Sequence, residues 1–198
     1  MQLLGEMLLS YIAIYIVIWM HEVGHAVFYW KYGCKKNFLK VTIKPYLFFS
    51  TPAPIEIEKL KMLTSRQHLI IGYGGILVNL LSTLIVFPIA CHIEFANQWI
   101  ELFLWQFLTL HFAEAISYLV LGNIYLVSDM LVIAQINPKL RIINFIAGVF
   151  LTILYIGIMN QVPYTIITIV MIYNLVTIAC MGGGRIVFTY LHNKKEVR

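Results

Sequence analysis

The chain contains one pattern whose residue types and spacing could do chemistry, the run His21-Glu22-Val23-Gly24-His25. On a helix, side chains at positions i and i+4 lie on one face, where two imidazoles can bind one zinc ion. A glutamate beside the first histidine is placed to take the proton of a water molecule on that metal. Five residues alone are weak evidence, so the interpretation depends on where the pattern lies.

The pattern lies at the end of an apolar stretch, Leu8 to Met20, which is typical of a membrane span. Ionisable side chains at membrane depth cost free energy and usually serve a function. The alternative is a pair of histidines packed in a helix bundle beside a capped glutamate, and it fits a soluble helix better than this one. We therefore interpret His21 and His25 as metal ligands and Glu22 as a general base.

The composition indicates an integral membrane protein independently of this motif. Of the 198 residues, 61% are hydrophobic and 12% are charged, and the mean hydropathy is +0.84. A soluble domain carries about 25% charged residues. Gln2 and Glu6 precede the first apolar stretch without a positive charge, so we expect a retained span and no cleaved signal peptide. The three cysteines have the spacing of neither a disulfide framework nor a structural zinc site.

We expect an all-α membrane protein with about five transmembrane helices. All 14 lysine and arginine residues fall in the segments on one side of these helices. By the positive-inside rule that side is cytoplasmic, which places the N-terminus outside and the C-terminus inside. The basic excess then follows from topology and requires no nucleic-acid partner. The predicted spans are about Met7–Tyr29, His68–Ala90, one within Trp99–Ala134, Ile142–Met159 and Tyr164–Met181.

The segment between the first two spans has a pattern of its own. Residues Asn37 to Lys44 alternate in part, and Pro45, Pro52 and Pro54 forbid a continuous helix. We expect an extended or hairpin segment that re-enters the membrane interface. An ordinary cytoplasmic loop with an aromatic patch over residues 46–49 fits the same pattern.

A zinc ion needs a third protein ligand, with the fourth position left for water. Asp129 lies near the cytoplasmic end of the third apolar stretch, at a depth comparable with that of His21 and His25. The i,i+3 pair of His111 and Glu114 lies toward the outer half. Depth therefore favours Asp129. There are four other candidates. Glu56 and Glu58 are interpreted as solvated loop charges, and His92 and Glu94 belong to the outer loop, on the opposite side of the membrane.

This choice of ligand constrains the third span. A span that ended at Leu121 would leave Asp129 about 12 Å beyond it, at 1.5 Å per residue. We therefore expect the span at roughly Phe112–Ala134, with a local break at Gly122 and Asn123. Residues 98–111 would then form an outer interfacial helix or the outer part of a long tilted one.

Three motifs follow one another between Met7 and Ile133. They are the HExxH run, the small-residue run Gly74-Gly75-Ile76-Leu77-Val78-Asn79, and the run from Asn123 to Asp129. In this order they resemble the motifs of the site-2 protease family of intramembrane zinc metalloproteases. The chain departs from the family pattern at three places: no proline stands between Asn123 and Asp129, Met130 follows the aspartate, and Ile76 follows the second glycine.

The resemblance implies one integral membrane metalloprotease domain over residues 1–198, with its core motifs within 7–133 and no PDZ or CBS domain. Zn²⁺ would be held by His21, His25 and Asp129. Glu22 would move the proton of a zinc-activated water to hydrolyse peptide bonds of membrane-spanning or membrane-embedded substrates. Asn79 would bind the substrate backbone or stabilise the oxyanion, or it would only join two helices.

The partners implied are a membrane-embedded peptide or protein substrate, the lipid bilayer and an unidentified regulatory membrane protein. The implied location is the cell membrane of a bacterium or archaeon. Two other classes fit parts of the pattern. One is a non-proteolytic sensor or transporter that binds a metal or protons, although no internal repeat is evident. The other is a membrane metalloprotease of another lineage, with Glu56 or the His111 and Glu114 pair as third ligand.

Overall fold

The computed structural model describes residues 2–45, 47, 50–93, 95–184, 186–187 and 190. Some of the residues considered above lie outside these ranges: Tyr46, Phe48, Phe49, Glu94, Arg185, Lys194, Lys195 and Arg198. The described chain is helical apart from loops and one isolated antiparallel bridge between Thr42 and Thr51.

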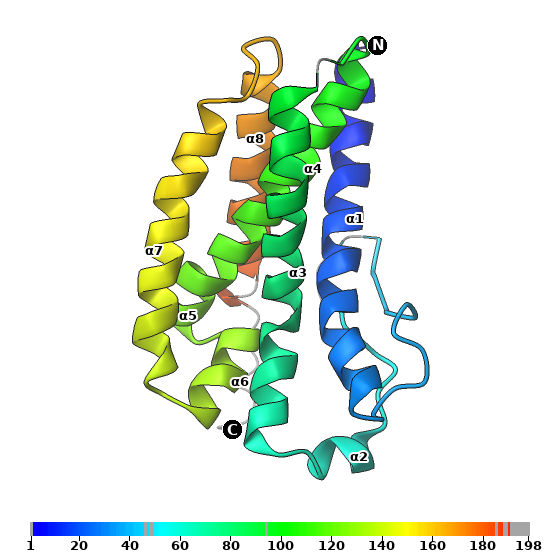
Figure 1. The fold of residues 1–198 in the computed structure, drawn as a ribbon, viewed down its shortest axis with the longest axis vertical. Coiled ribbons are helices and arrows are strands. Elements are labelled where there is room, and N and C mark those ends of the chain that lie inside the picture. The colour runs from blue at the N-terminus through cyan, green and yellow to red at the C-terminus, as the bar shows by residue number, and fades with distance from the viewer. Residues whose placement is uncertain are drawn as a thin grey trace.

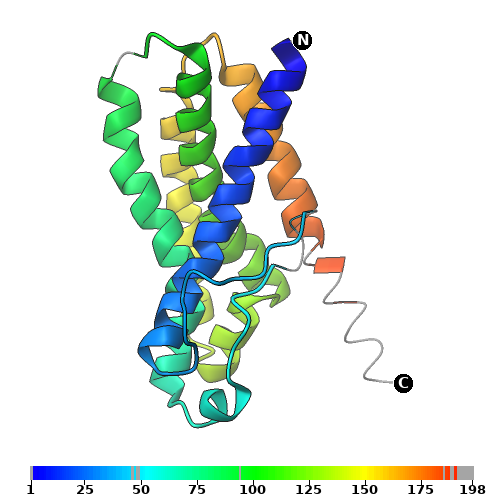
Figure 2. The same ribbon diagram turned by 90° about the vertical axis from the view of Figure 1, so that its right-hand side faces the viewer.

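The long helices run side by side along one axis (Figures 1 and 2). The N-terminus lies at one end of this bundle, and α2 and α6 lie at the other end (Figure 1). In chain order the elements are α1 (Gln2–Lys31), α2 (Ile57–Lys61), α3 (Ser65–His92), α4 (Gln98–Ser117), the π-helical turn η1 (Tyr118–Gly122), α5 (Asn123–Tyr125), α6 (Asp129–Ile136), α7 (Leu140–Met159), α8 (Ile167–Thr177) and the π-helical turn η2 (Ile178–Gly182).

Among the residues that the structure describes, four helical stretches are long and apolar enough to cross a membrane, namely Leu3–Lys31, Ser65–His92, Gln98–Tyr125 and Leu140–Met159. The region predicted as a fifth span forms a shorter apolar helix, Ile167–Gly182. Much of the outer surface suits hydrocarbon, because α7 leaves Ile142, Ile146 and Ile153 more than half exposed. The expectation of an all-helical protein with several helices of membrane-spanning length is therefore confirmed.

The predicted bounds of the third span are wrong. The helix runs from Gln98 to Tyr125 instead of from Phe112 to Ala134. Gly122 and Asn123 keep helical backbone angles, and the break follows them at Leu126 and Ser128, whose φ values are 51° and 55°. These left-handed residues turn the chain, so that Asp129 begins a separate short helix, α6. Asp129 thus lies outside the four helices of membrane-spanning length.

Two glycines allow α1 and α3 to touch through their backbones. A Cβ atom on Gly24 would lie 2.4 Å from the carbonyl oxygen of Gly74, and a Cβ atom on Gly74 would lie 2.6 Å from that of Gly24. Any side chain at either position would push the helices apart. This close approach, which small residues permit in membrane bundles, brings α3 directly against the HExxH run.

The segment between α1 and α2 returns along α1 (Figure 2). Thr42 and Thr51 exchange both backbone hydrogen bonds at 3.0 Å, so the two legs of the loop are extended beside each other. The Tyr11 hydroxyl donates to the carbonyl of Pro45, and Leu47, with 7% of its surface exposed, belongs to the same hydrophobic cluster as Ile14 of α1. The far end of this loop therefore lies against the first half of α1, on the N-terminal side of the HExxH run.

Candidate metal centre

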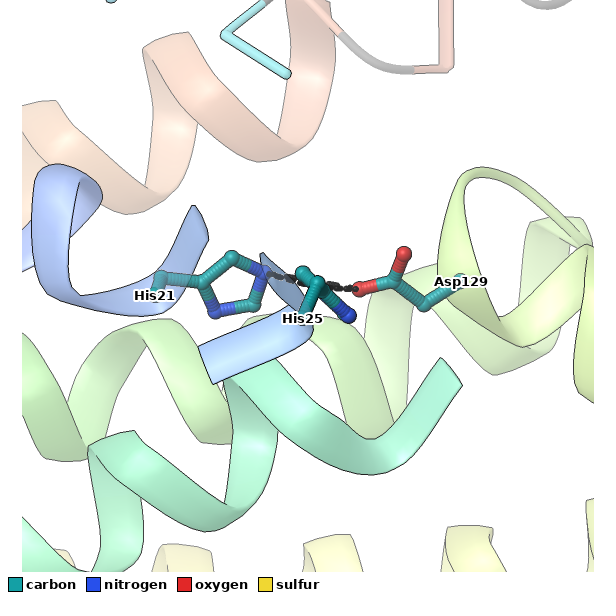
Figure 3. Close-up of side chains that lie close together, drawn as sticks. All are labelled: His21, His25 and Asp129. Atoms are coloured by element: carbon teal, nitrogen blue, oxygen red, sulfur yellow. Dashed lines mark hydrogen bonds and ion pairs between the residues drawn. The ribbon is translucent and has the colours of Figure 1, made fainter. Parts of the chain in front are cut away.

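Three donor atoms meet between the second half of α1 and the start of α6. The Nε2 atoms of His21 and His25 lie 3.1 Å apart. The Asp129 Oδ2 atom lies 3.4 Å from His21 Nε2 and 3.2 Å from His25 Nε2. Figure 3 shows the two imidazoles and the carboxylate directed toward one another. The histidines are buried, with 2% and 4% of their surface exposed, respectively.

One of these spacings lies within the range for one face of a tetrahedral zinc site, and the other two are 0.1–0.2 Å shorter. With zinc–nitrogen and zinc–oxygen distances of about 2.0–2.2 Å, two ligand atoms of a tetrahedron lie about 3.3–3.5 Å apart. The three observed separations are 3.1, 3.4 and 3.2 Å. Two imidazoles and a carboxylate are also a ligand set that catalytic zinc sites use, with the fourth position open. The residues present therefore fit a zinc ion in both chemistry and spacing.

Hydrogen bonds alone do not satisfy this cluster. His25 Nδ1 donates to the carbonyl of Ile71 at 2.6 Å, so in a neutral imidazole Nε2 is an acceptor that faces another acceptor, Asp129 Oδ2. Within the described part of the chain, Asp129 Oδ2 is buried, and its nearest polar partners are the Nε2 atoms of His25 and His21 at 3.2 and 3.4 Å. A cation among the three atoms would satisfy them all. A proton joins only two atoms, so the triangular arrangement favours a metal ion.

Two elements pack closely against the His21 ring. Tyr118, in the π-helical turn, stacks on it with ring centroids 4.6 Å apart and planes inclined by 7°. On α3, a Cβ atom at Gly75 would lie 2.4 Å from His21 Cε1. Only glycine at position 75 leaves room for the imidazole. The Gly74-Gly75 run therefore serves two contacts, one with the backbone of α1 and one with a candidate ligand.

Asn79 lies one turn further along α3, behind His21. Its amide nitrogen is 3.1 Å from His21 Nδ1, and its amide oxygen is 2.9 Å from His111 Nδ1 on α4. Asn79 and His111 are both fully buried. Asn79, which the motif resemblance suggests as a substrate-binding residue, thus lies between the imidazoles of His21 and His111.

The other candidate ligands lie apart from this cluster. In the described ranges, His21, His25 and Asp129 form the one group of at least three potential ligands close enough to share an ion. His111 contacts Asn79 and not the donor triangle. Glu114 is buried on α4 but is not in the group. Glu56 pairs with Lys59 at 2.8 Å on the exposed loop.

Three features of the site have no signal in residue spacing. They are the stacking of Tyr118, the carbonyl of Ile71 that orients His25, and the hydrogen bond from His111 to Asn79. Each depends on how helices pack.

The predicted general base, Glu22, directly follows His21 on α1 and has 7% of its surface exposed.

Comparisons of the chain with family models, with curated proteins and with solved structures find no match.

Proposed function

We propose that this protein is an intramembrane zinc metalloprotease of the site-2 protease type, which hydrolyses peptide bonds of membrane-spanning or membrane-embedded substrates. The observation that carries the proposal is the donor triangle of His21, His25 and Asp129, with separations of 3.1–3.4 Å. Two of its three residues, His21 and His25, lie on α1, a helix that is long and apolar enough to cross a membrane.

Glu22 favours a hydrolase over a passive metal site. A zinc ion, when bound, lowers the pKa of a water molecule toward neutrality and polarises a peptide carbonyl. Glu22 adjoins His21 in sequence and is buried, and it stays outside the donor triangle. Its carboxylate then accepts the proton of the attacking water and delivers it to the leaving amine. A sensor or carrier of metal ions has no need of this group.

Asn79 is a positioning residue in this proposal, in place of the substrate-binding role that its motif suggests. When Nε2 of His21 binds a metal, Nδ1 keeps the ring proton and needs an acceptor. The Asn79 amide at 3.1 Å supplies one through its oxygen after a half-turn of the amide. Its nitrogen then donates to Nδ1 of His111, which lies against the other end of the amide.

In the proposed membrane arrangement, the N-terminus lies outside and α2 lies at the cytoplasmic surface of a bacterial or archaeal membrane. The chain crosses this membrane five times if α8 and η2 together form the last crossing. Its support is that α2, with Lys59 and Lys61, lies at the end of the bundle opposite the N-terminus (Figure 1). The loop between α1 and α2 would then be a re-entrant segment, because Pro45 contacts Tyr11 in the first half of α1.

The metal content of purified variants tests this function. Wild type should bind one zinc ion per chain, and His21→Ala or Asp129→Ala should lose it. Glu22→Gln should keep the zinc while cleavage of a reconstituted single-span peptide falls by about 10²–10⁴-fold, the usual contribution of a general base. A wild-type protein without bound metal, or a Glu22→Gln variant that cleaves at the wild-type rate, would contradict the proposal.

A further inference from the structure

A second site lies at the end of α1, apart from the metal centre. Here the loop after α1 and the proline-rich segment before α2 enclose a cavity of about 620 Å³. Four of its lining side chains are lysines, Lys35, Lys36, Lys40 and Lys59, and one is an acid, Glu56. None of these residues belongs to the donor triangle.

The cavity carries uncompensated positive charge. Glu56 is engaged by Lys59, with the ammonium nitrogen 2.8 Å from a carboxylate oxygen. In the described portion of the chain, Lys35, Lys36 and Lys40 have no ion pair with a carboxylate. Four lysines and one carboxylate line the cavity, so its lining carries a net positive charge.

Lys35 is the informative member of this group. Its side chain is 5% exposed, and its ammonium donates to the carbonyls of Pro52 and Pro54 at 2.6 and 3.0 Å. These bonds fix the ammonium and hold the cavity wall, but carbonyls do not neutralise a charge. Burial, together with repulsion from Lys40, lowers the pKa of Lys35 from its usual value. An anion in the cavity would offset the cost of burying this cation.

The surroundings indicate which anion fits. The aromatic side chain of Trp30, half exposed at the end of α1, contacts Phe38 with ring centroids 5.6 Å apart. Tryptophan at the end of an apolar helix is typical of the membrane interface. Lysine binds phosphate as a point charge, and basic pockets at the cytoplasmic interface bind lipid headgroups. The cavity volume is within the range of small-ligand sites, about 300–1,000 Å³.

We propose that the cavity lined by Lys35, Lys36 and Lys40 binds a phosphate group at the membrane surface, carried by an anionic phospholipid or by a soluble phosphate ligand. Lys35 provides the fixed charge at the wall, and Lys36 and Lys40 provide the exposed charges at the opening. The site is independent of the proposed proteolysis, because it shares no residue with the metal centre.

The test compares two charge-matched double variants of the full chain in mixed micelles. Lys36→Gln with Lys40→Gln removes two lysines of the cavity. Lys44→Gln with Lys61→Gln removes two exposed lysines outside it, one in the loop and one at the end of α2. Binding is measured by native mass spectrometry and by the shift of Tm with phosphatidylglycerol, phosphatidylcholine or inorganic phosphate. Circular dichroism and thermal unfolding show that each variant is folded.

The proposal expects phosphatidylglycerol or inorganic phosphate to bind wild type, and phosphatidylcholine not to. The cavity variant should lose about 10- to 30-fold in affinity, given the usual contribution of a lysine near anionic lipid, while the control variant stays within about twofold. Binding of inorganic phosphate alone would identify a soluble ligand, and binding of phosphatidylglycerol alone would identify a lipid. Equal losses in both variants would show diffuse surface attraction and overturn the proposal, as would the absence of binding by either anion.

Discussion

The amide nitrogen of Asn79 lies 3.1 Å from Nδ1 of His21, on the side of the ring that faces away from the donor triangle. The amide is thus placed to decide which nitrogen of His21 carries the proton, and so which nitrogen is free to bind a metal. His111 holds the other end of the amide at 2.9 Å. Helices α1, α3 and α4 are joined at this point by one buried hydrogen-bonded chain.

The first prediction concerns this amide. Asn79→Leu keeps the size of the side chain but removes the acceptor, so zinc affinity should fall by about 10–100-fold, the usual effect of losing a group that orients a ligand. Asn79→Asp keeps an acceptor for His21 and should retain affinity close to wild type. Competition with a chromophoric chelator gives the affinities, and the absorption spectrum of bound Co²⁺ gives the ligand geometry.

The controls for Asn79 use its second partner. His111→Phe removes a partner of the amide, and adding it to Asn79→Leu should cause little further loss, since both changes break one chain. If wild type binds zinc and Asn79→Leu binds it equally well, the positioning role is wrong and the proposed protease survives. If wild type binds no metal, the proposed function itself fails.

How much of this site the sequence could predict depends on the residue. The spacing of His21 and His25 and the depth of Asp129 pointed to the three residues that the fold brings together. The route of the chain to Asp129 could not be predicted, because the break falls at Leu126 and Ser128. Neither residue is glycine or asparagine, the residues that most readily adopt a positive φ.

Other parts of the structure depend on tertiary packing alone. In the sequence, nothing distinguishes Lys35 from the other lysines of its loop, yet the fold buries its side chain against two proline carbonyls. The alternation over residues 37–44 and the three prolines after it indicate an extended or hairpin segment, but they do not indicate the contact of Pro45 with Tyr11, thirty-four positions earlier in the chain. Local patterns cannot specify such long-range contacts, because many loops have the same composition.

The second prediction concerns Gly75. A Cβ atom there would lie 2.4 Å from His21 Cε1 and 2.5 Å from Nε2, so Gly75→Ala should displace the imidazole and lower zinc affinity by at least about tenfold. The matched control is Gly72→Ala on the same helix, whose Cβ atom would meet only the Ile133 side chain at 3.1 Å. Equal zinc affinity in both variants would show that His21 does not need this space.

The third prediction concerns the contact between α1 and α3. Gly24→Ala places a Cβ atom 2.4 Å from a backbone oxygen of α3, and backbone cannot move aside as a side chain can. The free energy of unfolding should fall by about 1–3 kcal/mol or more, as in other overpacked interiors. Gly157→Ala on α7, where nothing lies within 4 Å of the new atom, is the control and should be neutral or slightly stabilising. Thermal unfolding in detergent measures both, and similar losses of Tm would refute the argument.

The last prediction concerns the orientation in the membrane. Reporter fusions at His92 and Val162 should read as outside, and fusions at Lys61 and Pro138 should read as cytoplasmic, because every lysine and arginine falls on the second side. A fusion at Lys194, beyond the described residues, should also read as cytoplasmic. The structure sharpens the expectation, since α2 and the start of α7 lie at one end of the bundle and the N-terminus at the other (Figure 1). A cytoplasmic reading at His92 would put the basic cavity outside the cell. It would then remove the argument for an anionic lipid of the inner leaflet while leaving the donor triangle intact.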